Sequence, residues 1–159
     1  MKTPLKIPAM SRSEYDDLIR NGSLCRIAFC GEQYPYIAPF LYVFDSRHLY
    51  FLSTRYGRKM QLFAQNPLVS VEIEDVSPDM GYYRFVTLQG KLSEVTDEQK
   101  KADVRRMFAG KITGRQISVN GLAALGHRPA DDPEAVVTED RTMVWKLVDV
   151  VDIVALKNG

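Results

Sequence analysis

The sequence predicts a mainly β protein: an antiparallel barrel, closed or partly closed, of about six strands with two or three short helices. Three observations support this fold class. Runs rich in branched aliphatic and aromatic residues recur along the chain, clusters of Gly, Pro, Asn and Asp separate them, and the helical segments between them are brief. A length of 159 residues fits one domain with its own core, and no internal repeat divides the chain. Residues 1–159 are therefore expected to form a single domain.

The first predicted element is a helix that begins after Ser11. Ser11 and Glu14 have the spacing of a capping box, and the Asn21-Gly22 pair suits a left-handed cap at the end of the helix. A meander of three strands then follows, because turn-forming residues separate three apolar runs. These runs span residues 24–30, 34–44 and 49–53.

The middle of the chain alternates helix and strand. A short helix over 58–65 ends at Asn66-Pro67, since the residue before a proline disfavours helical backbone. A Val- and Ile-rich strand over 68–75 comes next, and a longer strand follows over 82–95. Gly90 indicates a bulge or bend within the longer strand.

The last third predicts one more helix and one more strand. The helix covers residues 96–109 and stops at Gly110. Residues 111–140 form a loop-rich excursion with a short helix, because this segment holds several glycines and prolines. A strand over 142–156 closes the domain, and its larger apolar side chains share one face: Met143, Trp145 and Leu147. Trp145 is expected in the core or in a dimer interface.

Composition excludes several classes of function. A formal net charge of +1 gives no basic surface for nucleic acid, so no nucleic-acid partner is expected. No apolar run is long enough to cross a bilayer, and residues 1–8 lack the apolar core of a signal peptide. The sequence therefore predicts a cytoplasmic protein without a membrane partner.

The cysteines and histidines do not form a metal site. Cys25 and Cys30 lie five residues apart on one predicted strand, which points them to opposite faces, and both are expected to be buried free thiols. His48 and His127 have no spaced ligand set around them. No metal is predicted.

Residues 50–59 bring together the groups that hold a phosphate. A strand end, the hydroxyls of Ser53 and Thr54, a glycine, and the adjacent cations Arg58 and Lys59 at a helix start follow one another. A helix N-terminus favours an anion through its free N–H groups and its dipole, and Arg can add a bidentate contact. The alternative interpretation is an ordinary strand-to-helix turn with solvated cations.

The second strand is interrupted by prolines. Pro35 and Pro39 remove two backbone donors, so the run over 34–42 cannot be paired fully on both sides. With the small Ala38 between them, a planar ligand could lie against the backbone. The alternative is an edge strand that its prolines protect from aggregation.

These two segments belong to a longer series of linked motifs. The order is Pro-Tyr-x-x-Pro, an Asp turn, Leu-Tyr-Phe-x-Ser, Gly-Arg-Lys, and Asn-Pro before a Val-rich strand. From about residue 11 to residue 107 this order resembles the pyridoxamine 5′-phosphate oxidase-like FMN-binding split barrels. That family also includes nitroimidazole-resistance reductases and general stress flavoproteins.

The resemblance implies a six-stranded split β-barrel of Greek key topology that forms a homodimer, with two FMN sites in the cleft between subunits. It implies that Arg58 and Lys59 hold the FMN phosphate. The residues implied for the ribityl-phosphate arm are Leu52, Ser53 and Thr54, and those implied for the isoalloxazine are Ile37, Ala38, Pro39 and Phe40.

The chain also departs from the family pattern. The oxidase has an Arg and a Lys on the second strand where this chain has Ile37 and Tyr42, and a Gln near the flavin where it has Phe85. Its arginine-rich last strand has no counterpart here. Leu52 stands where nitroimidazole-type proteins usually have a histidine. The resemblance is therefore to the nitroimidazole-resistance and general-stress branch rather than to the true oxidase.

The predicted function is that of an FMN-binding flavoprotein, a small oxidoreductase supplied with electrons by a nicotinamide donor or a partner flavoprotein. The pattern identifies neither a catalytic residue nor the small-molecule substrate or electron acceptor. The alternative is a non-catalytic flavin-binding module, a sensor or a store. Deazaflavin or haem use by the same fold ranks third.

Overall fold

The computed structural model describes residues 2–159. Its strands are β1 (Leu24–Phe29), β2 (Tyr36–Phe44), β3 (Leu49–Thr54), β4 (Leu68–Val76), β5 (Tyr83–Glu94) and β6 (Thr142–Lys157). Its helices are α1 (Arg12–Asn21), α2 (Arg58–Gln65), α3 (Glu98–Thr113), the 3₁₀ helix η1 (Val119–Leu125) and α4 (Ala135–Thr138). No helix within the described residues is long and apolar enough to span a bilayer.

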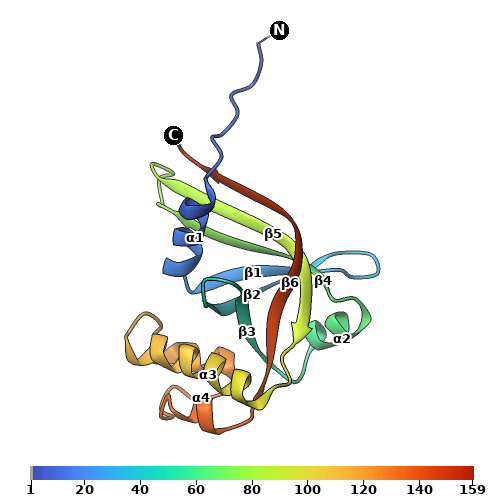
Figure 1. The fold of residues 1–159 in the computed structure, drawn as a ribbon, viewed down its shortest axis with the longest axis vertical. Helices are drawn as coiled ribbons and strands as arrows, with labels where there is room; N and C mark the ends of the chain where they lie inside the picture. The colour runs from blue at the N-terminus through green and yellow to red at the C-terminus, as the bar shows by residue number, and fades with distance from the viewer. Residues whose placement is uncertain (1) are drawn as a thin grey trace.

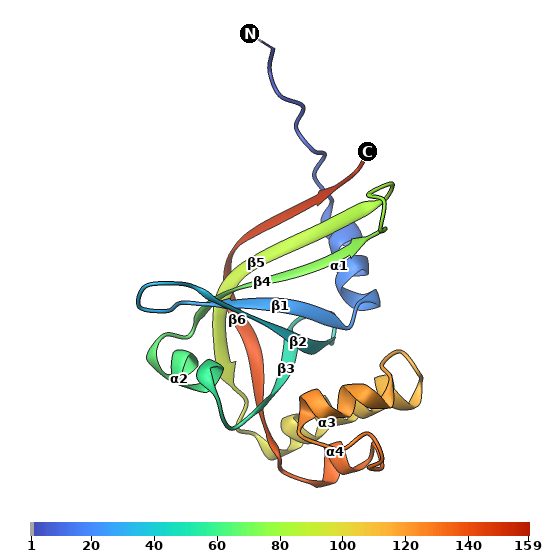
Figure 2. The same cartoon turned by 180° about the vertical axis from the view of Figure 1, so that it is seen from behind.

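The six strands form one closed antiparallel barrel in the order β1-β2-β3-β6-β5-β4. Because β4 returns to lie beside β1, the order β4-β1-β2-β3 is a Greek key. Figure 1 shows α1 beside the long β4-β5-β6 end of the barrel and α3 with α4 at the opposite end; Figure 2 shows α2 beside the barrel wall. The predicted fold class is confirmed.

Helix α1 begins as the capping box predicts. The Ser11 hydroxyl accepts a hydrogen bond from the Glu14 backbone N–H at 3.4 Å, and the Glu14 carboxylate accepts one from the Ser11 N–H at 3.1 Å. The helix buries Leu18 and Ile19 against the barrel. The buried Tyr42 hydroxyl donates to the Ile19 carbonyl at 2.6 Å, which joins the helix to β2.

Two hydrophobic cores share the strands β2, β3 and β6. The barrel core lies inside the barrel and is rich in aromatic side chains, among them Phe29, Phe40, Phe51 and Trp145. The second core lies between the barrel wall and α3 with η1, and includes Tyr50, Leu52, Val104, Phe108, Leu122 and Val144. All six residues of β3 are buried because each face of this strand packs against one of the cores.

An irregularity lies at Gly90 as predicted, but the extra residues of the bulge are on β6 and not on β5, because Gln89 pairs with Asp152 and Lys91 pairs with Val148. The β5–β6 register shifts between Gln89 and Lys91. A Cβ atom on Gly90 would lie 2.8 Å from the Val148 carbonyl oxygen, so the close approach of the two strands requires glycine. Opposite it, Asp149 has a positive φ of 51°. The bulge bends β6 as it leaves the barrel.

The prediction that a helix ends at Gly110 is wrong. Helix α3 continues to Thr113, and Gly114 caps it. A glycine inside a helix costs only about 1 kcal/mol relative to alanine. The burial of Phe108 and Ile112 on either side of Gly110 outweighs that cost.

The prediction that both cysteines are buried thiols is wrong for one of them. Cys25 is buried on β1, but Cys30 is exposed. Strand β1 ends at Phe29, so Cys30 lies past the last inward-facing position. Its thiol lies 3.5 Å from the Leu68 carbonyl oxygen.

The 111–140 excursion contains η1 and α4, as the predicted mixture of loop and short helix requires. An ion-pair cluster joins its end to the barrel. The Asp140 carboxylate accepts from Arg105 at 2.7 Å and from Arg55 at 2.9 Å, and Arg105 is buried. Both guanidinium groups also donate to the Thr142 carbonyl. Hydrogen bonds from Arg55 and Arg105 lower the pKa of Asp140 to about 2.

Replacing Asp140 with Asn should lower the free energy of unfolding by about 1 kcal/mol at neutral pH, because the exposed carboxylate is partly screened. The folded-state pKa lies below the usual value of 3.8, so the stabilisation is present above about pH 4 and is lost as the pH falls towards 2. Urea unfolding of both proteins across this range measures the difference. The difference between the two proteins should shrink towards zero as the pH falls to 2. A difference that stays constant down to pH 2 would contradict the prediction.

Candidate functional site

The barrel is split between β2 and β3. The two strands pair only through Tyr42, Val43 and Phe44. Residues 36–41 of β2 pair with β1 but have no β3 partner within the described chain, and the last residues of β3 pair only with β6. The partly unpaired second strand is therefore confirmed. Its free backbone edge faces the segment that leads into α2.

Helix α2 begins at this split without a side-chain cap. Gly57 occupies the N-cap with a positive φ of 95°, a conformation that favours glycine. No side chain accepts from the first N–H groups of the helix in the part of the chain that the structure describes. These N–H groups and the helix dipole favour an anion at this end.

Lys59 is a half-buried cation at this helix start. Its Nζ donates to the Thr54 hydroxyl at 3.1 Å and lies 5.5 Å from the centroid of the Phe40 ring. Burial lowers the pKa of Lys59. Among residues 2–159 no carboxylate forms an ion pair with it, so an incoming anion would be its first counter-ion.

Arg58 stands beside Lys59 at the surface. Its guanidinium carbon lies 5.4 Å from the centroid of the Tyr36 ring, which is a cation–π arrangement. Arg58 forms no ion pair with any described residue. The stacked ring limits the motion of the side chain and leaves the edge of the guanidinium free for a bidentate contact.

The four predicted residues of β2 divide between two faces. Ala38 and Phe40 are buried in the barrel, whereas Ile37 and Pro39 are exposed on the outside. A planar group at the free edge would therefore meet the backbone of all four residues. It would not meet all four side chains.

The three predicted residues of β3 also divide. Leu52 points into the second core, so only its backbone can face the split. The Ser53 hydroxyl is fully buried; it donates to the Thr54 carbonyl at 3.0 Å and lies 3.8 Å from the Met60 sulfur. Thr54 presents its hydroxyl to Lys59. Thr54, Arg58 and Lys59 thus form one cluster, to which Ser53 gives internal support.

Two aromatic residues belong to the site although the sequence did not assign them to it. The Tyr36 ring forms the cation–π contact with Arg58, and the ring centroid of the exposed Tyr56 lies 6.0 Å from the Lys59 Nζ. Tyr56 is only three residues from Lys59 in the sequence, so that contact had a local signal, whereas Tyr36 comes near Arg58 only once β2 and α2 lie together in the fold. Tyr42, by contrast, is a packing residue that holds α1.

We call this set the cradle: the free β2 edge over 36–40, the end of β3, and the cations Arg58 and Lys59. It combines an uncapped helix start, two cations without carboxylate partners in the described chain, and a free strand edge. An anion at the helix start with a planar group against β2 fits these features.

Comparisons with known proteins identify the relatives of this chain. A family model described as pyridoxamine 5′-phosphate oxidase matches residues 11–143. An uncharacterized protein of Rhizobium meliloti is 30% identical over 93 residues, which cover 58% of this chain and 60% of the length of that relative.

Solved structures share the fold at lower identity. A FAD-binding protein of Mesorhizobium loti is 16% identical with a TM-score of 0.69, and the match covers 98% of this chain and 100% of that one. A FAD-binding protein of Mycobacterium smegmatis is 19% identical with a TM-score of 0.62, and the match covers 96% and 98% of the two chains.

Proposed function

This chain belongs to the pyridoxamine 5′-phosphate oxidase family, and on that premise we propose that it is an FMN-binding flavoprotein that acts as a small oxidoreductase. One observation carries the proposal. Lys59 is a half-buried cation without a carboxylate partner in the described chain, at an uncapped helix start that faces a free strand edge. A phosphate joined to a planar ring would give Lys59 and the helix start their anion, and its ring could lie against the free strand edge.

In this proposal Arg58, Lys59 and the first N–H groups of α2 hold the phosphate. Thr54 keeps the Lys59 ammonium in place, and the backbone of 37–40 meets the polar edge of the ring system. When bound, the flavin supplies the hydride and electron chemistry. The protein supplies binding, orientation and exclusion of water, and a nicotinamide nucleotide is the proposed electron donor.

A homodimer is part of the proposal, because apolar side chains are exposed on the outer barrel face that adjoins the β2 edge of the cradle. The outer barrel face carries a groove of about 430 Å³, whose lining includes Ala28, Ile37 and Thr87. Ile37 is 63% exposed, and Val154 of β6, which pairs with Thr87, is 47% exposed. A second copy seated on this face would cover both side chains. Cytoplasmic location and the absence of a nucleic-acid partner stay predictions of the sequence.

The neighbours described as FAD-binding raise the question of which flavin is bound. The cradle offers two cations beside one helix start, which suits a single phosphate group. FMN is therefore the proposed cofactor. FAD and a deazaflavin are the alternatives that a binding experiment must compare.

Addition of FMN to the purified protein should give a bound flavin spectrum and raise the melting temperature. At a hundredfold excess over Kd the stabilisation is about 2.7 kcal/mol, or roughly 5–10 °C for a domain of this size. Riboflavin, which lacks the phosphate, is the matched control and should bind much more weakly. A protein that stays colourless and thermally unchanged with FMN would contradict the proposal. The mass of the loaded protein, expected at twice the 18.1 kDa of the chain, is measured in the same samples.

The non-catalytic alternative has its own supporting observation. The titratable side chains that meet at the cradle, Lys59, Tyr36 and Tyr56, are placed as ligands or as packing groups rather than as an acid–base pair. Oxidation of NADH or NADPH by the FMN-loaded protein with a panel of acceptors separates the two functions. Bound flavin without turnover would identify a sensor or store.

A further inference from the structure

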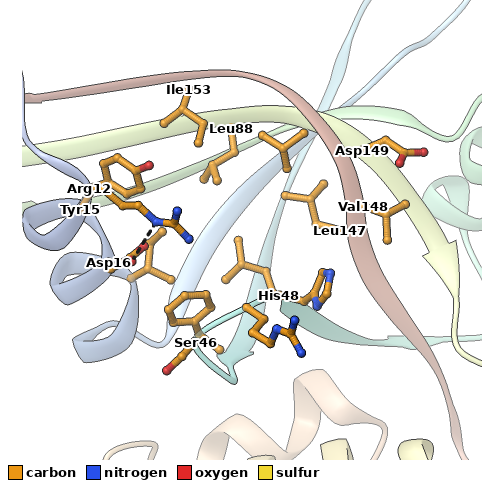
Figure 3. Close-up of a pocket in the computed structure, with 15 residues that line it drawn as sticks. Arg12, Tyr15, Asp16, Ser46, His48, Leu88, Leu147, Val148, Asp149 and Ile153 are labelled. Atoms are coloured by element: carbon orange, nitrogen blue, oxygen red, sulfur yellow. Dashed lines mark ion pairs between the residues drawn. The ribbon is translucent and has the colours of Figure 1, made fainter.

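A second cavity, of about 360 Å³, lies between α1, the β2–β3 turn and β6 (Figure 3). Its volume lies within the range of small-ligand sites. Its polar lining includes Arg12, Asp16, Arg47, His48 and Asp149. The cavity shares no residue with the cradle.

The cavity and the cradle lie at opposite ends of β3. Leu49 opens the strand and lines the cavity, whereas Thr54 ends the strand and carries the cradle hydroxyl. The five residue steps from Leu49 to Thr54 separate the two sites by about 17 Å. A ligand in the cavity would therefore not occupy the cradle of the same chain.

The floor of the cavity is apolar. Ile19, Leu49 and Leu147 are buried in its wall, and the half-buried Phe44 extends it towards the rim. In Figure 3, Leu88 and Ile153 lie together at the upper side of the cavity, and Leu147 lies nearer to His48. A ligand with an aromatic or branched aliphatic body would gain free energy from burial against this floor.

The rim offers one cation and one neutral donor whose side chains form no ion pair with a carboxylate of the described residues. Arg12 and Asp16 form an ion pair with each other at 3.7 Å, so their charges are matched. Arg47 forms no ion pair with a described residue. Burial lowers the pKa of His48, so its imidazole is neutral at physiological pH and offers one N–H.

The Asp45 side chain fixes the turn that carries Arg47 and His48. Its carboxylate accepts from the Arg47 N–H at 2.9 Å and from the His48 N–H at 2.8 Å. Lys100 lies 3.5 Å from the same carboxylate and balances its charge. The remaining carboxylate, Asp149, lies beyond the β6 ribbon from His48 in Figure 3. Asp149 also lines the cavity, so the rim favours an anion only on its Arg47 and His48 side, across β6 from that carboxylate.

We propose that this cavity is a second ligand site, which takes a small amphipathic carboxylate with its aromatic or branched aliphatic body on the floor and its anion beside Arg47 and His48. One free guanidinium with one neutral donor suits a monoanion. The inference does not depend on the function proposed for the cradle.

Calorimetric titration with 3-phenylpropionate, and with its neutral amide as a matched probe, tests the proposal on the full chain. The acid should bind about tenfold more tightly than the amide, and Arg47→Ala should remove that difference. Val150→Trp should weaken both probes, because the indole would fill a cavity whose wall includes Val150. Arg128→Ala removes another exposed arginine, outside the cavity, and should change neither.

Two further samples separate this site from the cradle. The Arg58→Ala/Lys59→Ala variant and the FMN-saturated protein should bind 3-phenylpropionate as the unmodified protein does. Displacement of the probe by FMN would mean that the two sites are one and would overturn the proposal. Equal binding of acid and amide, or no binding of either at millimolar concentration, would overturn it as well.

Discussion

Replacing Arg58 and Lys59 together with alanine should weaken FMN binding by about 10²–10⁴-fold. A hydrogen bond to a charged group contributes about 1.5–3 kcal/mol, and each 1.4 kcal/mol corresponds to a factor of ten in Kd. Few other groups can compensate, because Ile37 and Tyr42 stand where the oxidase has cations and Arg55 is already bound to Asp140. The two residues should therefore carry most of the phosphate affinity.

The same substitutions should leave the fold intact. Arg58 is exposed, and Lys59, which belongs to neither core, contributes only one hydrogen bond to Thr54 and a cation–π contact with the Phe40 ring. Loss of two unpaired cations near one helix start removes repulsion and a mismatch with the helix dipole, so the melting temperature without flavin should stay within a few degrees.

Flavin fluorescence quenching measures Kd, with Lys100→Ala/Lys101→Ala as the matched control. Those lysines are also adjacent cations in the first turn of a helix, but each has a carboxylate partner, Asp45 and Glu98 respectively. The control should keep its FMN affinity. An unchanged Kd for FMN in Arg58→Ala/Lys59→Ala would refute the assignment of these two residues to the phosphate, whatever Kd the control variant shows.

The elements that the sequence predicted well are those with local signals. The capping box at Ser11, the bulge at Gly90 and the interrupted pairing of β2 at Pro39 each depend on one or two residues whose backbone chemistry allows few alternatives. The turn-forming residues between the apolar runs located the strands of the barrel for the same reason. Local signals also placed Arg58 and Lys59 beside one helix start.

The features that the sequence did not predict depend on tertiary partners. Alternation along β3 cannot show that both faces are buried, because the second core exists only once α3 lies on the barrel wall. The direction of Leu52, and hence its limitation to backbone contact at the cradle, follows from that packing. The extension of α3 past Gly110 has the same origin, since Phe108 and Ile112 find partners in the second core. The cavity beside His48 joins three elements that are distant in sequence.

Trp145→Ala should lower the free energy of unfolding by about 3–5 kcal/mol, a large part of the 5–15 kcal/mol typical of a domain. The indole is fully buried in the barrel core. Its ring centroid lies 4.8 Å from that of Phe63, 5.9 Å from Phe40 and 6.2 Å from Phe29. Urea unfolding measures the loss.

Trp145→Phe is the matched control and should cost less, about 1–2 kcal/mol. A phenyl ring keeps most of the apolar contact, and the Nε1 of Trp145 has no hydrogen-bond partner among the described residues, so its removal breaks no bond. A loss as large for Phe as for Ala would show that the cost does not come from packing volume.

Trp145 should also help to position the cradle, because it packs against helix α2. Phe63 belongs to α2, and its contact with Trp145 is the closest ring pair around the indole, so this contact fixes the helix whose first turn carries Arg58 and Lys59. Trp145→Ala should therefore weaken FMN binding even in conditions where the protein stays folded, whereas Trp145→Phe should bind nearly normally. Phe63→Ala, which removes only the α2 side of the contact, should reproduce the loss of affinity at a smaller cost in stability. Normal FMN affinity in folded Trp145→Ala would mean that α2 is held by its other contacts and that the core does not position the phosphate site.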